Sequence, residues 1–107
     1  MSRSAYLKGR GLEEFAEVLK LLAEPSRLQM IYSMGLECRP VAAIIEATAM
    51  TQTNVSFHLR ALREAGLVRG ERRGAFVYYC VSDPLLLRIL DDLKAWVEER
   101  DRSGVQA

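Results

Sequence analysis

Hydrophobic residues recur at intervals of three and four along most of the chain, and this period predicts five amphipathic helices. The expected helices cover residues 12–22, 25–34, 41–48, 51–63 and 84–99. Between the last two, residues 67–69 and 75–81 have the composition of β-strands, and a polar run at residues 70–74 separates them. We therefore predict a mainly α fold of the α+β class, with a small β-hairpin and the order α-α-α-α-β-β-α.

Residues that start and stop helices stand at the edges of these stretches. Pro25 suits the first turn of the second helix, and Gly35 ends it. Thr51 or Thr53 can cap the fourth helix, and Gly66 supplies a left-handed stop after it. A tight turn joins the third and fourth helices into a helix-turn-helix, and the hairpin that follows makes it winged.

The fourth helix carries an unusual polar face. No carboxylate lies within residues 51–63, whereas an ordinary solvated helix mixes both signs of charge. Amides, hydroxyls and cations suit the base edges and phosphates that a helix meets in the major groove of DNA. The residues that we predict to contact DNA from this helix are Thr51, Gln52, Thr53, Asn54, Ser56, Phe57, His58 and Arg60. For His58 a second interpretation stays open, that of an ordinary half-exposed residue.

The hairpin adds positive charge beside that helix. Residues 51–80 hold five arginines against two glutamates, a local charge of +3, while residues 1–50 balance at zero and residues 81–107 sum to −2. The protein is nearly neutral as a whole, but its segment 51–80 is basic, which is typical of a nucleic-acid-binding surface. We predict that Arg69, Arg72 and Arg73 of the wing contact DNA as well.

The last helix has more apolar surface than one small domain can bury. Its apolar stripe continues over about three turns, and the first helix offers a similar face. We predict a homodimer through these two helices. The interface residues expected are Phe15, Leu19, Leu86, Ile89, Leu90, Leu93, Trp96 and Val97.

Length and composition bound the remaining possibilities. A chain of 107 residues, half of them apolar, fits one domain, which we place at residues 12–101 between an N-terminal arm (1–11) and a C-terminal tail (102–107). No apolar run reaches the length of a membrane span, and the first residues lack the apolar core of a signal peptide, so we expect no membrane partner and a cytoplasmic location. With one histidine and no Gly-rich phosphate loop, no active site is assembled, and we expect no enzyme activity.

Four segments in the same order resemble the ArsR/SmtB family of bacterial repressors. They read LLAEPSRL (21–28), TQTNVSFHL (51–59), LREAGLV (62–68) and GAFVYY (74–79), and the likeness extends over roughly residues 12–99. The resemblance implies a dimeric winged helix-turn-helix that sits on a palindromic operator in double-stranded DNA, blocks transcription and leaves when an inducer binds. Carried over position by position, it places recognition at Gln52, Thr53, Ser56, His58 and Arg60, and the wing contacts at Arg72 and Arg73.

The chain departs from the family where inducers bind. Members that sense thiophilic metals carry cysteines in the third helix, where this chain has Ala42 and Ala43. Members that bind zinc-like ions between the last helices use histidines there. The only histidine of this chain is His58, which lies outside those helices. We therefore expect no metal at either site and no cofactor. Cys38 and Cys80 remain, and in winged helices the extended piece that holds Cys38 pairs antiparallel with the second wing strand, which would bring the two together.

Two interpretations of these cysteines stay open. They are either small buried residues or an inducer-sensing pair that takes a disulfide, a polysulfide bridge or a thiophilic ligand such as arsenite. The alternative function is a winged-helix regulator without metal or thiol sensing, which responds to an organic ligand or acts only as a protein-interaction module. An RNA-binding module is disfavoured because exposed stacking aromatics are scarce on the basic face.

Overall fold

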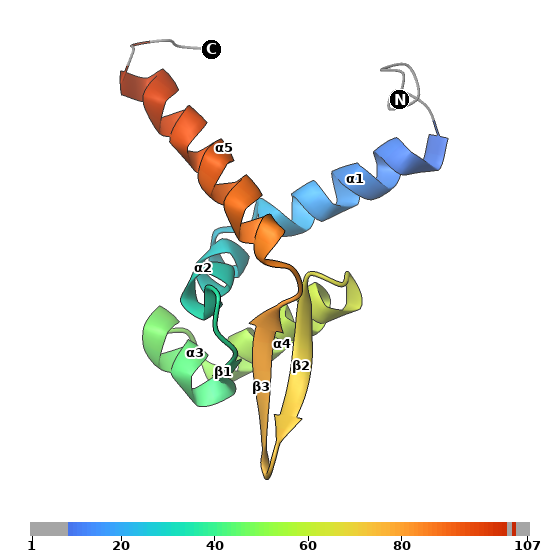
Figure 1. Cartoon of the computed structure of the whole chain (residues 1–107), viewed down its shortest axis with the longest axis vertical. Coiled ribbons are helices and arrows are strands. Elements are labelled where there is room, and N and C mark those ends of the chain that lie inside the picture. The colour runs from blue at the N-terminus through green and yellow to red at the C-terminus, as the bar shows by residue number, and fades with distance from the viewer. Residues whose placement is uncertain (1–8, 103, 105–107) are drawn as a thin grey trace.

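The computed structural model describes residues 9–102 and residue 104, and its element order confirms the predicted winged helix-turn-helix. The elements are α1 (Gly9–Leu22), α2 (Pro25–Met34), β1 (Arg39–Pro40), α3 (Val41–Thr48), α4 (Gln52–Glu64), β2 (Val68–Arg73), β3 (Phe76–Val81) and α5 (Pro84–Arg102). Helices α2, α3 and α4 form the body of the domain. The β2–β3 hairpin projects from one end of it, and α1 and α5 diverge from the other (Figure 1).

The helix ends follow the local signals of the sequence. The carboxylate of Glu24 accepts from the backbone N–H of Arg27 at 3.0 Å and caps α2, with Pro25 in the first turn. At the start of α4 the backbone N–H of Asn54 donates to the Thr51 hydroxyl at 3.1 Å, as expected of a cap. Gly66 has φ +77°, the left-handed conformation predicted for the stop after this helix.

The core lies where the three body helices meet the sheet. Its fully buried side chains come from α2, α3, α4 and β2, and they are Met30, Ile31, Met34, Ile44, Val55, Leu62 and Val68. Leu87 and Leu90 of α5 close the core on the far side. Because α4 contributes Val55, Leu59 and Leu62, the opposite face of that helix is left to solvent.

The sheet has three antiparallel strands in the order β1-β3-β2. The hairpin is longer than predicted, and the expected turn at residues 70–74 was wrong. Residues 70–73 continue β2, and the turn itself is Gly74–Ala75. Cross-strand pairing with β3 satisfies the backbone there, and a hairpin that projects into solvent tolerates the charged side chains that suggested a turn.

The outer ends of the first and last helices lie beyond the expected ones. Helix α1 begins at Gly9 instead of residue 12, and α5 continues to Arg102, one residue past the predicted end of the domain. The remainder of the predicted arm, residues 1–8, lies outside the described residues, as do residues 103 and 105–107 of the predicted tail.

Candidate nucleic-acid interface

Helix α4 presents its polar face to solvent because its apolar side is fixed in the core. Val55, Leu59 and Leu62 are buried, whereas most of the polar residues between them are exposed. The predicted contact residues that are exposed on α4 and its cap are Thr51, Gln52, Thr53, Asn54, Ser56, Phe57 and Arg60. The first carboxylate along α4 is that of Glu64, the last residue of the helix. It accepts a hydrogen bond from Arg60 Nε at 3.0 Å.

His58 does not share this exposure. Its side chain is 15% exposed, and its Nε2 lies 4.0 Å from the Glu24 carboxylate that caps α2. Its Nδ1 is buried and has no hydrogen-bond partner among the described residues. His58 is therefore less exposed than either interpretation expected, and its contact with DNA stays a prediction.

The wing arginines fall on two faces of the hairpin. Alternation along β2 puts Arg69, Glu71 and Arg73 on one face and Arg72 on the other. Arg72 shares its face with Tyr79, and Tyr79 lines a hollow of about 240 Å³ together with Ser56 of α4. Of the three wing arginines, Arg72 is thus the one on the side of α4, and it makes no hydrogen bond or ion pair within the described part of the chain.

Glu71 occupies the other face and was not singled out by the sequence. Its Oε2 accepts from Arg69 Nη1 at 3.2 Å and lies 3.5 Å from Arg73 Nη2. The hydrogen bonds from Arg69 and then from Arg73 hold the pKa of the Glu71 carboxyl below its usual range. The Arg73 guanidinium also stacks over the Tyr78 ring at 4.7 Å. Two of the three wing arginines are therefore partly neutralised.

The two cysteines meet at the base of the wing. Pairing of Arg39 with Tyr79 brings Cys38 beside Cys80, the Cα atoms lie 4.3 Å apart, and the sulfurs are joined in a disulfide. The expected proximity across β1 and β3 is confirmed. Glu71 Oε2 lies 3.6 Å from Cys38 Sγ and 3.8 Å from Cys80 Sγ. A cavity of about 90 Å³ borders both cysteines and the start of α5.

The diverging helices carry an apolar surface. Phe15, Leu19, Ile89, Leu93, Trp96 and Val97 are all exposed large hydrophobic residues. Leu90, also expected at an interface, is 8% exposed in the protomer's own core, and Leu86 is partly buried against the same core. The unpaired surface therefore lies on the outer part of α5 and on α1, which stand apart from the body in Figure 1.

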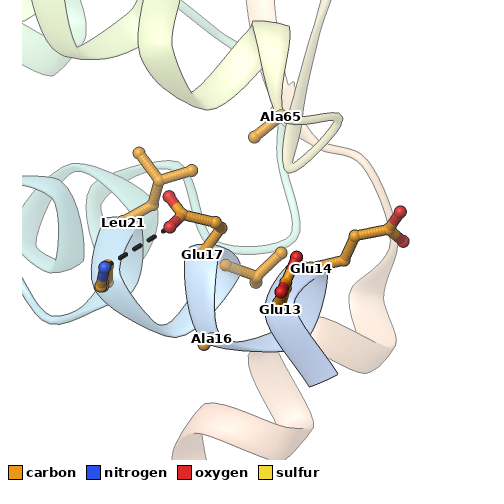
Figure 2. A pocket seen from close by; sticks show the side chains of 8 residues that line it. Glu13, Glu14, Ala16, Glu17, Leu21 and Ala65 are labelled. Atoms are coloured by element: carbon orange, nitrogen blue, oxygen red, sulfur yellow. Dashed lines mark hydrogen bonds and ion pairs between the residues drawn. The ribbon is translucent and has the colours of Figure 1, made fainter. Parts of the chain in front are cut away.

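A hollow beside α1 is a different kind of surface. It has a volume of about 820 Å³ and lies between α1 and the end of α4, and Figure 2 shows carboxylates of Glu13, Glu14 and Glu17 around it. Lys20 pairs with Glu17 at 3.4 Å. This acidic surface is unsuited to nucleic acid and is distinct from the basic one on α4 and the wing. In the described residues no helix is long and apolar enough to cross a membrane.

Known proteins are similar to this chain in sequence and in fold. The family model for "Bacterial regulatory protein, arsR family" matches residues 24–69. The chain is 37% identical to the HTH-type transcriptional regulator NmtR of Mycobacterium tuberculosis, over 83% of this chain and 74% of NmtR. It is 35% identical to the HTH-type transcriptional repressor SmtB of the same species, over 82% of this chain and 65% of SmtB, so it spans just under two thirds of that relative. The solution structure of the homodimeric winged helix-turn-helix DNA-binding domain of Mb0332 from Mycobacterium bovis superposes with a TM-score of 0.79 and 31% identity, covering 100% of this chain and 95% of that one.

Proposed function

Since the chain belongs to the arsR family of bacterial regulatory proteins, we propose that it reads its operator through α4 and Arg72 and releases it when Cys38 and Cys80 are oxidised. Like its relatives, it is a DNA-binding transcriptional repressor that acts as a homodimer. The observation that carries the DNA-contact proposal is the exposed, acid-free face of α4 beside a basic wing.

The contacts divide by chemistry. Gln52, Thr53 and Ser56 offer amide and hydroxyl groups that suit base edges, whereas Arg60 and Arg72 offer charge to phosphates. His58 serves as a packing residue between α4 and α2. A two-fold dimer through α1 and α5 places two α4 helices about one DNA turn apart, roughly 34–36 Å, so the operator is an inverted repeat.

Two substitutions test this division of contacts. Arg72→Ala removes a charge-based contact, so we expect it to weaken binding to all duplexes and to lower the salt slope by roughly one unit per lost phosphate contact. Gln52→Ala removes a base contact, so we expect it to relax base preference at a cost of roughly 1–3 kcal/mol on the best site. Fluorescence anisotropy over a salt series measures both. An unchanged salt slope for Arg72→Ala would contradict the wing assignment.

The thiol switch is supported by the position of the cysteines. A transcriptional repressor works beside chromosomal DNA, which in bacteria means the cytoplasm, where glutathione and thioredoxin keep thiols reduced and disulfides are usually transient. Cys38 and Cys80 are nevertheless placed to join without backbone movement. With a hydroperoxide as oxidant, the two thiols lose two electrons and two protons to form the disulfide, and hydrogen peroxide is reduced to two molecules of water.

Oxidation would reach the DNA surface through the sheet. Strand β1 runs directly into α3 at Pro40–Val41, and β3 is the central strand of the wing. A covalent bond between Cys38 and Cys80 fixes the base of the wing against the helix-turn-helix and so sets the position of Arg72 relative to α4. In the proposed switch, the sheet of the reduced protein can adjust its position to the DNA. The disulfide of the oxidised protein prevents this adjustment and so lowers operator affinity.

The deciding experiment compares operator binding by wild type, Cys38→Ser and Cys80→Ser in excess reductant and after hydrogen peroxide, with a metal chelator present throughout. We expect peroxide to weaken operator binding by the wild type and reductant to restore it, while both serine variants bind alike in the two conditions. If both variants respond to peroxide as the wild type does, the cysteines are structural, and the inducer acts elsewhere, as in a regulator that responds to an organic ligand.

A further inference from the structure

Three ligand atoms of the kinds that hold transition metals converge at the base of the wing. Cys38 Sγ, Cys80 Sγ and a carboxylate oxygen of Glu71 all lie within 4.8 Å of one another, and they come from β1, β3 and β2 or their immediate ends. We propose that in the reduced protein these three residues bind a thiophilic divalent cation such as Zn²⁺ or Cd²⁺, and that the ion and the disulfide exclude each other.

The spacing of the ligand atoms fits tetrahedral coordination. Zinc bonds of about 2.3 Å to sulfur and about 2.1 Å to oxygen, set at the tetrahedral angle, put sulfur and oxygen about 3.6 Å apart. The observed distances from Glu71 Oε2 to the two sulfurs are 3.6 and 3.8 Å. Two sulfurs on one zinc ion lie about 3.8 Å apart by the same geometry, which is a non-bonded contact that only reduced cysteines can make. Reduction of the disulfide therefore lets the two sulfur atoms move apart to the separation that a bound ion requires.

The surroundings leave room for the ion. The cavity of about 90 Å³ beside the sulfurs is bordered by Gly35, Leu36 and Pro84, and a water takes about 30 Å³ of liquid volume. Cys80 is 4% exposed, whereas the Glu71 side chain is 42% exposed, so the carboxylate faces the solvent side of the site. Two thiolates and one carboxylate from the protein, with a water in the fourth position, are a donor set that suits Zn²⁺ and Cd²⁺.

Binding of the ion would also affect the ion pairs of the wing arginines. The same Oε2 atom that faces the sulfurs holds Arg69 and Arg73, so coordination of this oxygen to a cation competes with both arginines. Binding of the ion displaces two thiol protons, and oxidation of the two thiolates by peroxide releases the ion. An effect of the ion on DNA binding through Arg69 and Arg73 rests on the proposed function, whereas binding of the ion itself does not. It also uses no residue of α3 or α5, where the resemblance places the metal sites of the family.

Direct metal binding tests the site. Reduced protein, stripped with a chelator and then freed of it, is titrated with Cd²⁺ and with Zn²⁺ by calorimetry, and the ultraviolet absorption of cadmium–thiolate bonds is followed in parallel. We expect one ion per protomer for the wild type and loss of binding in Cys38→Ser and Cys80→Ser. Glu71→Gln should keep the fold and weaken binding at least about tenfold. Glu37→Gln is the matched control, because Glu37 stands next to Cys38 in sequence but pairs with Arg39 at 3.2 Å.

A second readout separates this proposal from the redox switch. Bound Zn²⁺ should slow the loss of free thiols to hydrogen peroxide in the wild type and in Glu37→Gln, but much less in Glu71→Gln. Glu71→Gln should still form the disulfide in metal-free buffer. If oxidation there leaves operator binding unchanged, the redox switch fails, while the proposed ion site is unaffected. No ion bound by the reduced wild type, or equal affinity in Glu71→Gln and the wild type, would overturn the proposal.

Discussion

Replacing Glu71 with glutamine should release the wing arginines that it now holds. One carboxylate oxygen serves Arg69 at 3.2 Å and Arg73 at 3.5 Å, and a neutral amide of the same shape has no charge with which to hold them. Arg73 adjoins the turn at the tip of the wing, whereas Arg69 lies at its base opposite Cys80. We therefore expect one new phosphate contact per protomer, made by Arg73.

The size of the effect follows from counterion release. Each phosphate contact on duplex DNA changes the logarithmic salt slope by about 0.9, so two contacts per dimer make the slope steeper by about 1.8. Across a fourfold change in salt concentration, that difference corresponds to roughly a tenfold change in the ratio of variant to wild-type affinity. Fluorescence anisotropy with the operator and with a scrambled duplex measures it, using reduced protein in the presence of a chelator.

The pH dependence and the control sharpen this prediction. Because Arg69 and then Arg73 lower the pKa of the Glu71 carboxyl, their pairing is complete at neutral pH and is lost only as pH falls through that lowered pKa. The difference in slope between variant and wild type should therefore be constant from about pH 6 to about pH 8. Glu98→Gln makes the same charge change on α5, where Glu98 pairs with Lys94, and should leave the slope as in the wild type. Equal slopes for Glu71→Gln and the wild type would refute a role for Arg73 at the phosphates.

Three further changes test the other parts of the structure. Leu93→Glu puts a charge into the exposed apolar surface of α5, so sedimentation should show monomers, and operator binding should be lost with the dimer; a variant that stays dimeric would contradict the interface assignment. Ile44→Ala leaves a cavity at a fully buried position of α3 and should cost about 2–5 kcal/mol of unfolding free energy in a urea titration, whereas a cost below that range would mean that the core collapses around it. Thr51→Ala removes the cap of α4 and should cost about 1 kcal/mol, while Thr51→Ser, which keeps the hydroxyl, should cost much less.

Local signals were sufficient for most of the fold. Caps, prolines and glycines act within a few residues of where they stand, so Pro25 and Gly66 could be assigned, and the cap of α4 narrowed to Thr51 or Thr53, before any tertiary structure was known. The polar face of α4 was equally accessible, because the side chains that anchor the helix in the core also determine which side remains exposed.

Features that depend on contacts between distant elements were not predictable in the same way. His58 lies on the same helix as the polar face, but its side chain is only 15% exposed, and its Nε2 lies 4.0 Å from Glu24, the cap of α2. Leu90 matches the apolar stripe of α5, yet it belongs to the protomer's own core. Glu71 looked like one more charge in a polar turn, and its contacts with two arginines and two sulfurs exist only because β2 extends to Arg73 and pairs with β3. Such roles depend on strand register and on packing across the domain.

The bond between Cys38 and Cys80 has a consequence for chain topology. The two residues are 42 positions apart, and the segment between them holds β1, α3, α4, β2 and most of β3, while α1, α2 and α5 stay outside. Oxidation thus closes the part of the domain that we propose to contact DNA into a covalent ring, from which α1 and α5 are excluded. Closing a loop of this length restricts the unfolded chain by about 4 kcal/mol. Under the proposed switch, oxidation would make the protein harder to unfold while it loses its operator, so heat resistance and operator affinity would change in opposite directions.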